Sequence, residues 1–156
     1  MRFHVFPSFV FVPLFIILLT GCSQNVKVSG KVVFDDGAPL ETGVVVCSDG
    51  KAEYLGRIGA GGTYSMGVLK DGTGIPKGTY AVCIRGAEEQ TGRIVKLTGP
   101  SREEVDEPER YCVVENKFTD HKLSGLTITV PSGDYTLKAG QKQPIPPPNP
   151  KSRYAK

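Results

Sequence analysis

Residues 26–34 read VKVSGKVVF, and their apolar and polar side chains alternate. The apolar positions are Val26, Val28, Val32 and Phe34, and the polar ones between them are Lys27, Ser29 and Lys31. Successive side chains of an extended chain point to opposite faces, so this alternation is typical of a β-strand that buries one face. The residues that follow, Asp-Asp-Gly at 35–37, favour a turn because Asp and Gly tolerate the backbone angles of a tight turn.

The same signals recur along most of the chain and predict an all-β fold. Glycine and aspartate turns are expected at residues 48–50, 70–72 and 132–134. No segment shows a convincing helical period. Short strands with turn chemistry between them favour a single β-sandwich. The further strands are expected over residues 43–48, 53–58, 63–68, 78–85, 111–114, 126–130 and 135–137.

Residues 87–109 interrupt this pattern with a polar, acidic stretch. Its acidic residues include Glu103, Glu104, Asp106, Glu107 and Glu109. They lack the alternating D-x-D-x-D-G order of a calcium-binding loop. We therefore expect a solvated, charged excursion from the sandwich, without a metal site.

The N-terminus has the pattern of an export signal. Residues 9–19 form an apolar run, FVFVPLFIILL, which is shorter than the roughly 20 residues that a transmembrane helix needs. The run closes on Leu19-Thr20-Gly21-Cys22, which resembles the lipobox of bacterial lipoproteins. The resemblance implies that a signal peptidase recognises Leu19, Thr20 and Gly21. It also implies that the chain is cut before Cys22 and that Cys22 carries the lipid.

These features predict a location in the cell envelope. Acyl chains such as palmitate on Cys22 would hold the protein on the outer or the cytoplasmic membrane, facing away from the cytoplasm. Two or more such chains give a stable anchor. Removal of residues 1–21 takes away one of the 19 basic residues, Arg2, and leaves 18 against 16 acidic ones. This near balance does not suggest a nucleic-acid partner, which would require a basic face.

Several short motifs resemble carboxypeptidase regulatory-like domains, which are transthyretin-like β-sandwiches. They are VSGKV at residues 28–32, DGAPL at 36–40, GVV at 43–45, GTYS at 62–65, KGTYAV at 77–82, FTD at 118–120 and SGLTITV at 124–130. In this order they cover residues 26–138, nearly the whole mature chain. The resemblance implies a Greek-key sandwich of about seven strands that serves as a structural or binding module, without catalysis or a cofactor.

Three cysteines remain besides Cys22, namely Cys47, Cys83 and Cys112. The residues alone leave two alternatives open: one disulfide in any of three arrangements, or three unpaired thiols buried as small apolar groups. The register of the resembling family implies that Val45 and Cys47 point inward and Cys83 outward. On that register, Cys83 and Cys112 are the better disulfide pair.

Few residues could support catalysis or metal binding. Among enzymes of related folds, hydroxyisourate hydrolases need several histidines and a C-terminal Tyr-Arg-Gly-Ser, and intradiol dioxygenases bind iron through two tyrosines and two histidines. The mature chain has one histidine, His121, and ends in SRYAK. A zinc site built from His121 and the three cysteines is disfavoured, because no two of these ligands are close in sequence as in a C-x-x-C pair. We expect no enzyme activity and no bound metal.

The expected function is that of an envelope module that binds or scaffolds another surface protein or polymer. The alternative is a carrier for a sugar or peptide. A carrier would need exposed aromatic side chains on loops at one end of the sandwich, and the candidates are Tyr54, Tyr111 and Phe118. A transthyretin-like hydrolase is a remote third hypothesis.

The chain is expected to divide into four parts. Residues 1–21 are the lipoprotein signal peptide, residues 22–25 a lipidated tether, and residues 26–140 the β-sandwich. Residues 141–156 contain five prolines and four basic residues, which favour an extended, disordered tail. A weaker interpretation is that this tail touches anionic lipid or cell-wall polymer.

Overall fold

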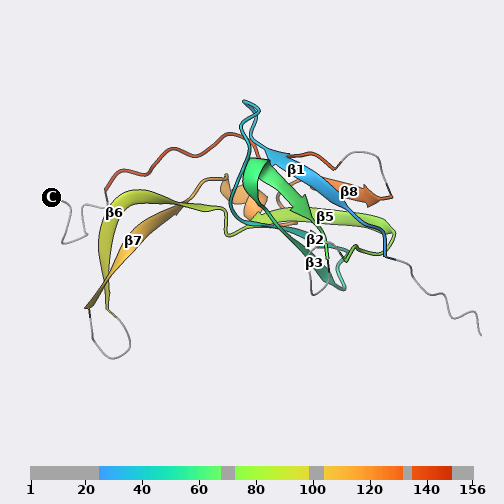
Figure 1. The fold of residues 1–156 in the computed structure, drawn as a ribbon, viewed down its shortest axis with the longest axis horizontal. Coiled ribbons are helices and arrows are strands. Elements are labelled where there is room, and N and C mark those ends of the chain that lie inside the picture. Colours follow the sequence, from blue (N-terminus) through green and yellow to red (C-terminus); the bar gives the residue numbers. More distant parts are fainter. Residues whose placement is uncertain (1–24, 68–72, 99–103, 132–134, 149–156) are drawn as a thin grey trace, which may run out of the picture.

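The structure, a computed structural model, describes residues 25–67, 73–98, 104–131 and 135–148, and most of its regular elements are strands (Figure 1). No helix in these four segments is long and apolar enough to cross a bilayer. Two short 3₁₀ turns are η1 Ala60–Gly62 and η2 Asn116–Thr119. The strands are β1 Ser29–Val33, β2 Val44–Ser48, β3 Glu53–Arg57, β4 Thr63–Ser65, β5 Gly78–Arg85, β6 Glu88–Thr98, β7 Glu104–Cys112, β8 Leu126–Val130 and β9 Leu137–Lys138.

Seven of these strands form two sheets that pack as a sandwich. One sheet has the order β4-β1-β9 and the other has the order β3-β2-β5-β8. β1 pairs antiparallel with β4 and parallel with β9, whereas the second sheet is antiparallel throughout. The β2–β3 hairpin lies in the chain between β1 and β4, which pair in the opposite sheet, so the connection is of the Greek-key kind. The predicted all-β sandwich is confirmed.

The inward-facing residues of the strands form a continuous core between the sheets. Val28 and Val32, from the alternating stretch at residues 26–34, are fully buried there. The Tyr64 hydroxyl donates a hydrogen bond to the Tyr135 carbonyl at 2.7 Å and ties β4 to the chain before β9. Among the described residues, those of the core and those packed against it lie within residues 26–139. A chain that begins at residue 23 therefore contains all of these described core residues.

A two-stranded antiparallel ribbon, made of β6 and β7, leaves the sandwich after β5 (Figure 1). The Val113 N–H donates to the Ala87 carbonyl at 2.9 Å and closes the base of the ribbon. The predicted excursion over residues 87–109 is thus confirmed, but the expectation of no strand between residues 85 and 111 is wrong, because both sides of the excursion are strands. Charged residues occupy both faces of the ribbon, so its sequence carries little of the apolar alternation that marks a strand.

The described chain begins at one end of the sandwich, and the ribbon lies beyond the opposite end (Figure 1). Val26 pairs with Ile75, just before β5 begins, whereas the ribbon starts just after β5 ends. β5 has 8 residues. At roughly 3.4 Å per residue, its two ends are about 24 Å apart. We call the end that contains Val26 and Ile75 the tether end.

Candidate functional site

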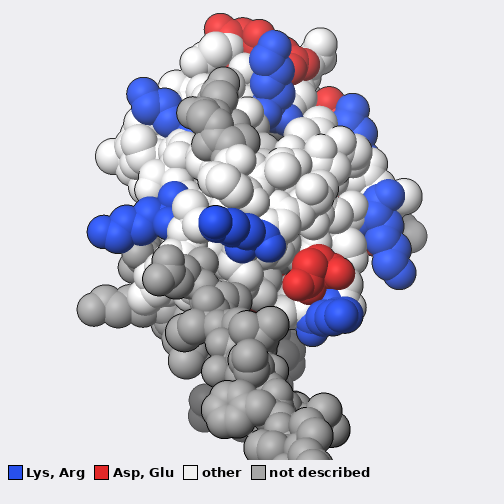
Figure 2. Space-filling view, turned by 90° about the vertical axis from the view of Figure 1, so that its right-hand side faces the viewer, with Lys and Arg blue, Asp and Glu red and all other residues white. Residues whose placement is uncertain are grey.

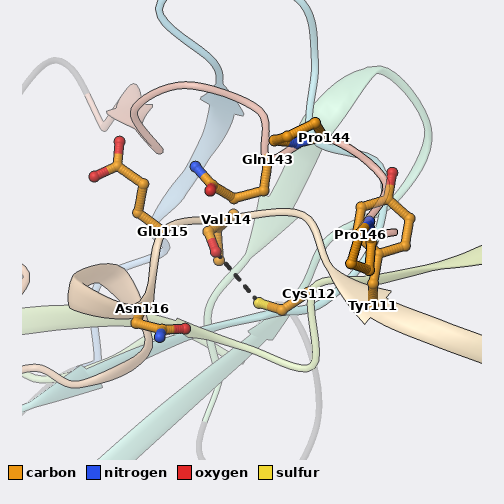
Figure 3. A pocket seen from close by; sticks show the side chains of 8 residues that line it. All are labelled: Tyr111, Cys112, Val114, Glu115, Asn116, Gln143, Pro144 and Pro146. Carbon is orange, nitrogen blue, oxygen red and sulfur yellow. Dashed lines mark hydrogen bonds between the residues drawn. The ribbon is translucent and has the colours of Figure 1, made fainter. Parts of the chain in front are cut away.

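A groove lies where the ribbon meets the sandwich, between the end of β7 and the C-terminal segment, residues 141–148. Its volume is about 360 Å³. Figure 3 shows Tyr111 and Pro146 at one end of the groove and Glu115 and Asn116 at the other. Since residues 143–146 form one wall, the groove exists only when the C-terminal segment is in place. The lining residues are Tyr111, Cys112, Val114, Glu115, Asn116, Gln143, Pro144 and Pro146.

Backbone and side-chain hydrogen bonds hold the C-terminal segment against the ribbon. The Gln143 N–H donates to the Val113 carbonyl at 2.8 Å, as an added strand would. Further along, the Arg93 guanidinium of β6 donates from Nη2 to the Pro146 carbonyl at 2.9 Å. These two bonds fix both the register and the direction of the segment along the ribbon.

The expected disordered tail is therefore wrong for residues 141–148. Lys142 adds an ion pair, its Nζ lying 2.7 and 2.8 Å from the two carboxylate oxygens of Glu89. A proline-rich chain favours an extended conformation, while the amides of Gln141 and Gln143 stay free to bond. Residues 149–156 lie outside the described residues.

The groove offers one thiol and one carboxylate. The Cys112 thiol donates to the Val114 carbonyl, with 3.4 Å between sulfur and oxygen (Figure 3). Glu115 pairs with Lys117 at 2.8 Å, and this contact, with the Gln141 N–H, lowers the pKa of the Glu115 carboxyl, which is therefore charged at neutral pH. No histidine lines the groove to activate the thiol. The groove thus presents a thiol and a charged carboxylate beside Tyr111 and Pro146.

The two cysteines expected to form a disulfide lie in different parts of the fold. Cys83 of β5 is paired with Val46 of β2, whereas Cys112 of β7 is paired with Glu88 of β6. Cys47, Cys83 and Cys112 are all free thiols, so the predicted Cys83–Cys112 disulfide is wrong. The ribbon is the physical reason, because it pairs Cys112 with β6 instead of returning it to β5. The predicted orientations are confirmed, with Cys47 in the core and Cys83 outside it.

Cys83 is fully buried although it lies on the outer face of its sheet. Arg85 and Glu53 form a two-pronged ion pair on this face, with Nη1 and Nη2 each 2.8 Å from a carboxylate oxygen. The hydrogen bond from Arg85 lowers the pKa of Glu53. Arg85 also contacts the Cys83 thiol, whose pKa is raised chiefly by burial. The thiol is therefore both covered and protonated at neutral pH.

His121 was the remaining candidate metal ligand. Its Nδ1 atom is buried, and no hydrogen-bond partner for it lies among the described residues. Across all the described residues, no group of three or more His, Cys, Asp or Glu side chains is arranged to hold a metal ion. His121 and the cysteines are thus not brought together as a zinc site.

The aromatic residues proposed for a ligand-binding rim are separated. Tyr54 is 8% exposed and packs edge-to-face on Tyr80, with 5.4 Å between ring centroids, and Phe118 is 6% exposed in the same core. Only Tyr111 of the three lines the groove. The rim that the carrier hypothesis requires is not formed. The predicted lipobox residues, 19–22, lie outside the described residues.

Comparison with protein families and with curated proteins finds no match to this chain. Among solved structures, it is similar to a 9R-lipoxygenase from Cyanothece PCC8801, with 14% sequence identity and a TM-score of 0.31. The similarity covers 83% of this chain and 18% of the lipoxygenase chain. A likeness this weak carries no argument about fold or activity.

Proposed function

We propose that the protein is a lipid-anchored module of the bacterial cell envelope that binds another envelope protein or polymer and does no chemistry on it. The observation that carries the proposal is the sequence Leu19-Thr20-Gly21-Cys22, which follows an apolar run of signal-peptide length. Only residues 23–25 separate Cys22 from the sandwich. The four steps from Cys22 to Val26 span at most about 14 Å, so an anchor on Cys22 would keep the tether end close to the bilayer.

The arrangement of the fold supports display of the ribbon away from such an anchor. The ribbon leaves from the end of the sandwich opposite the tether end (Figure 1). β6 has 11 residues and a contour length of roughly 35 Å at 3.3 Å per residue, and it curves as it leaves the sandwich (Figure 1). The groove at the base of the ribbon combines charged Glu115 with apolar faces of Tyr111 and Pro146. These features favour an extended polar partner that approaches from the side away from the membrane.

The anchor is tested by replacing Cys22 with serine in cells. We expect the wild-type protein to incorporate labelled palmitate and to have lost residues 1–21, whereas Cys22→Ser should take up no label and retain its leader. The N-terminus is read by mass spectrometry, because an uncut leader could itself hold the variant on a membrane. Cys112→Ser is the matched control and should be lipidated normally. A Cys22→Ser protein that is still cut and still membrane-bound would refute the anchor.

The binding site is tested by photo-cross-linking in intact cells. A photoreactive amino acid at Asn116, which is exposed at the groove, should give a discrete cross-linked species with an envelope component. The same amino acid at Thr127, exposed on β8, is the control and should give at least about tenfold less product. Equal yields at both positions would show that the groove is not the binding surface.

A further inference from the structure

The tether end exposes three lysines. Lys27 follows Val26, which pairs with Ile75, and Lys77 lies two residues after Ile75. Lys51 occupies the turn between β2 and β3, beyond Ser48. Ser48 pairs with Ala81 in the middle of β5, and because the two strands are antiparallel the turn lies toward the start of β5. Three segments distant in sequence thus bring lysines to one end of the sandwich, which suggests a surface for an anionic partner.

Among the described residues 26–27, 48–52 and 75–78, one is acidic, Asp49. Its carboxylate accepts hydrogen bonds from the N–H groups of Ala52 and Lys51, each at 2.8 Å. These bonds lower the pKa of Asp49, so it is charged at neutral pH and offsets one of the lysines. The described residues 26–27, 48–52 and 75–78 therefore carry a formal net charge of +2. Figure 2 views the molecule from this side and shows more Lys and Arg than Asp and Glu on the surface.

The opposite end of the molecule has the opposite charge. Residues 88–98 and 104–112, the strands of the ribbon, contain six acidic and three basic residues, a formal net charge of −3. Lys142, the basic residue of the described C-terminal segment, pairs with Glu89 of the ribbon and reduces the net negative charge there to −2. Charge is thus separated along the long axis of the molecule, with the positive pole at the tether end.

We infer that the tether end is a docking surface for anionic membrane lipids, through Lys27, Lys51 and Lys77. The inference rests on the proposed anchor, since residues 23–25 would keep Val26, the first residue of the sandwich, within about 14 Å of the lipidated Cys22. That distance is between one and two Debye lengths of about 8–10 Å in physiological salt, so attraction between the tether end and the bilayer is only partly screened. Each lysine near an anionic surface strengthens binding roughly fivefold. An anionic bilayer also repels the acidic ribbon, which favours the same orientation. The molecule stands with its tether end on the membrane and its ribbon pointing away from it.

Vesicle binding of the chain that comprises residues 23–156 tests the docking surface without the anchor. This chain retains all the core residues that the structure describes. At about 10 mM salt, where the Debye length is about 30 Å, we expect it to sediment with phosphatidylglycerol vesicles and not with phosphatidylcholine vesicles. The triple variant Lys27→Gln, Lys51→Gln, Lys77→Gln should bind phosphatidylglycerol at least tenfold more weakly.

A second triple variant controls for net charge. Lys96→Gln, Lys117→Gln, Lys122→Gln removes the same charge from exposed sites outside the tether end and should keep wild-type binding within about twofold. Equal losses in the two variants would overturn the inference, and so would equal binding to both kinds of vesicle. Binding to soluble polyglutamate but not to phosphatidylglycerol would assign the surface to a polymer instead. These outcomes do not depend on Cys22, whose lipidation is measured separately.

Discussion

Replacing Gly30 by alanine is expected to lower the free energy of unfolding by about 3 kcal/mol. Gly30 lies in β1 opposite Tyr64, and a Cβ atom at this position would collide with the backbone oxygen of Tyr135. It would also come within 2.9 Å of the Tyr135 carbonyl carbon and Cβ. Tyr135 cannot retreat freely, because its carbonyl accepts the 2.7 Å hydrogen bond from the Tyr64 hydroxyl. Both overpacking and loss of this buried bond therefore contribute to the cost.

Urea unfolding of the chain that comprises residues 23–156 measures this effect. Gly78→Ala is the matched control, because Gly78 is also a strand residue and the atoms nearest to its added Cβ belong to the Tyr80 side chain, at 3.5 Å or more. Gly78→Ala should change the free energy of unfolding by no more than about 1 kcal/mol. Alanine at this position also reduces the conformational entropy of the unfolded chain, which offsets the cost of the contact. If Gly30→Ala were no more destabilising than Gly78→Ala, the close contact between β1 and Tyr135 would not exist.

The strands of the sandwich could be predicted because burial leaves a pattern in the sequence. Val28 and Val32 face the core while Lys31 between them is exposed, so residues 26–34 must alternate. Residues 78–85 carry the same pattern through Tyr80 and Val82. A one-residue shift would expose every core side chain of such a strand, so the alternation also fixes its register. The outward orientation of Cys83, which the family resemblance implied, agrees with that register.

The ribbon and the groove leave no comparable pattern. β7 has charged side chains on both faces and contains Pro108, a residue that ordinarily argues against a strand. The C-terminal segment binds through the backbone carbonyls of Val113 and Pro146, and every residue has a carbonyl. Such contacts cannot be recognised from side-chain types. The Cys83–Cys112 disulfide was mispredicted for the same reason, because the pairing of Cys112 depends on the unrecognised ribbon.

The three thiols of residues 23–156 are expected to differ about a thousandfold in reactivity toward a thiol reagent at pH 8. Burial raises the pKa of Cys47 to about 12, so only about one molecule in ten thousand carries the reactive thiolate at that pH. Cys83 is fully buried and its pKa is also raised by burial. Cys112 is partly exposed at the groove and should react first. One thiol should therefore be labelled quickly in the native protein and three after unfolding.

Replacing Arg85 by alanine should distinguish the two slowly labelled thiols, Cys47 and Cys83, by their labelling rates. Arg85 contacts the Cys83 thiol and, with Glu53, forms the ion pair on that face of the sheet. Without the guanidinium, Cys83 should become a second fast thiol, whereas Cys47, in the core between the sheets, should stay slow and report that the sandwich is intact. Mass spectrometry of labelled peptides identifies each site. The contrary result would be a native protein with no fast thiol, in which only Cys47 is labelled after unfolding without reductant. It would mean that Cys83 and Cys112 are bonded and that the pairing of Cys112 with β6 is incorrect. The count of labelled cysteines thus tests the position of the ribbon, because a ribbon that pairs Cys112 with Glu88 holds it away from Cys83.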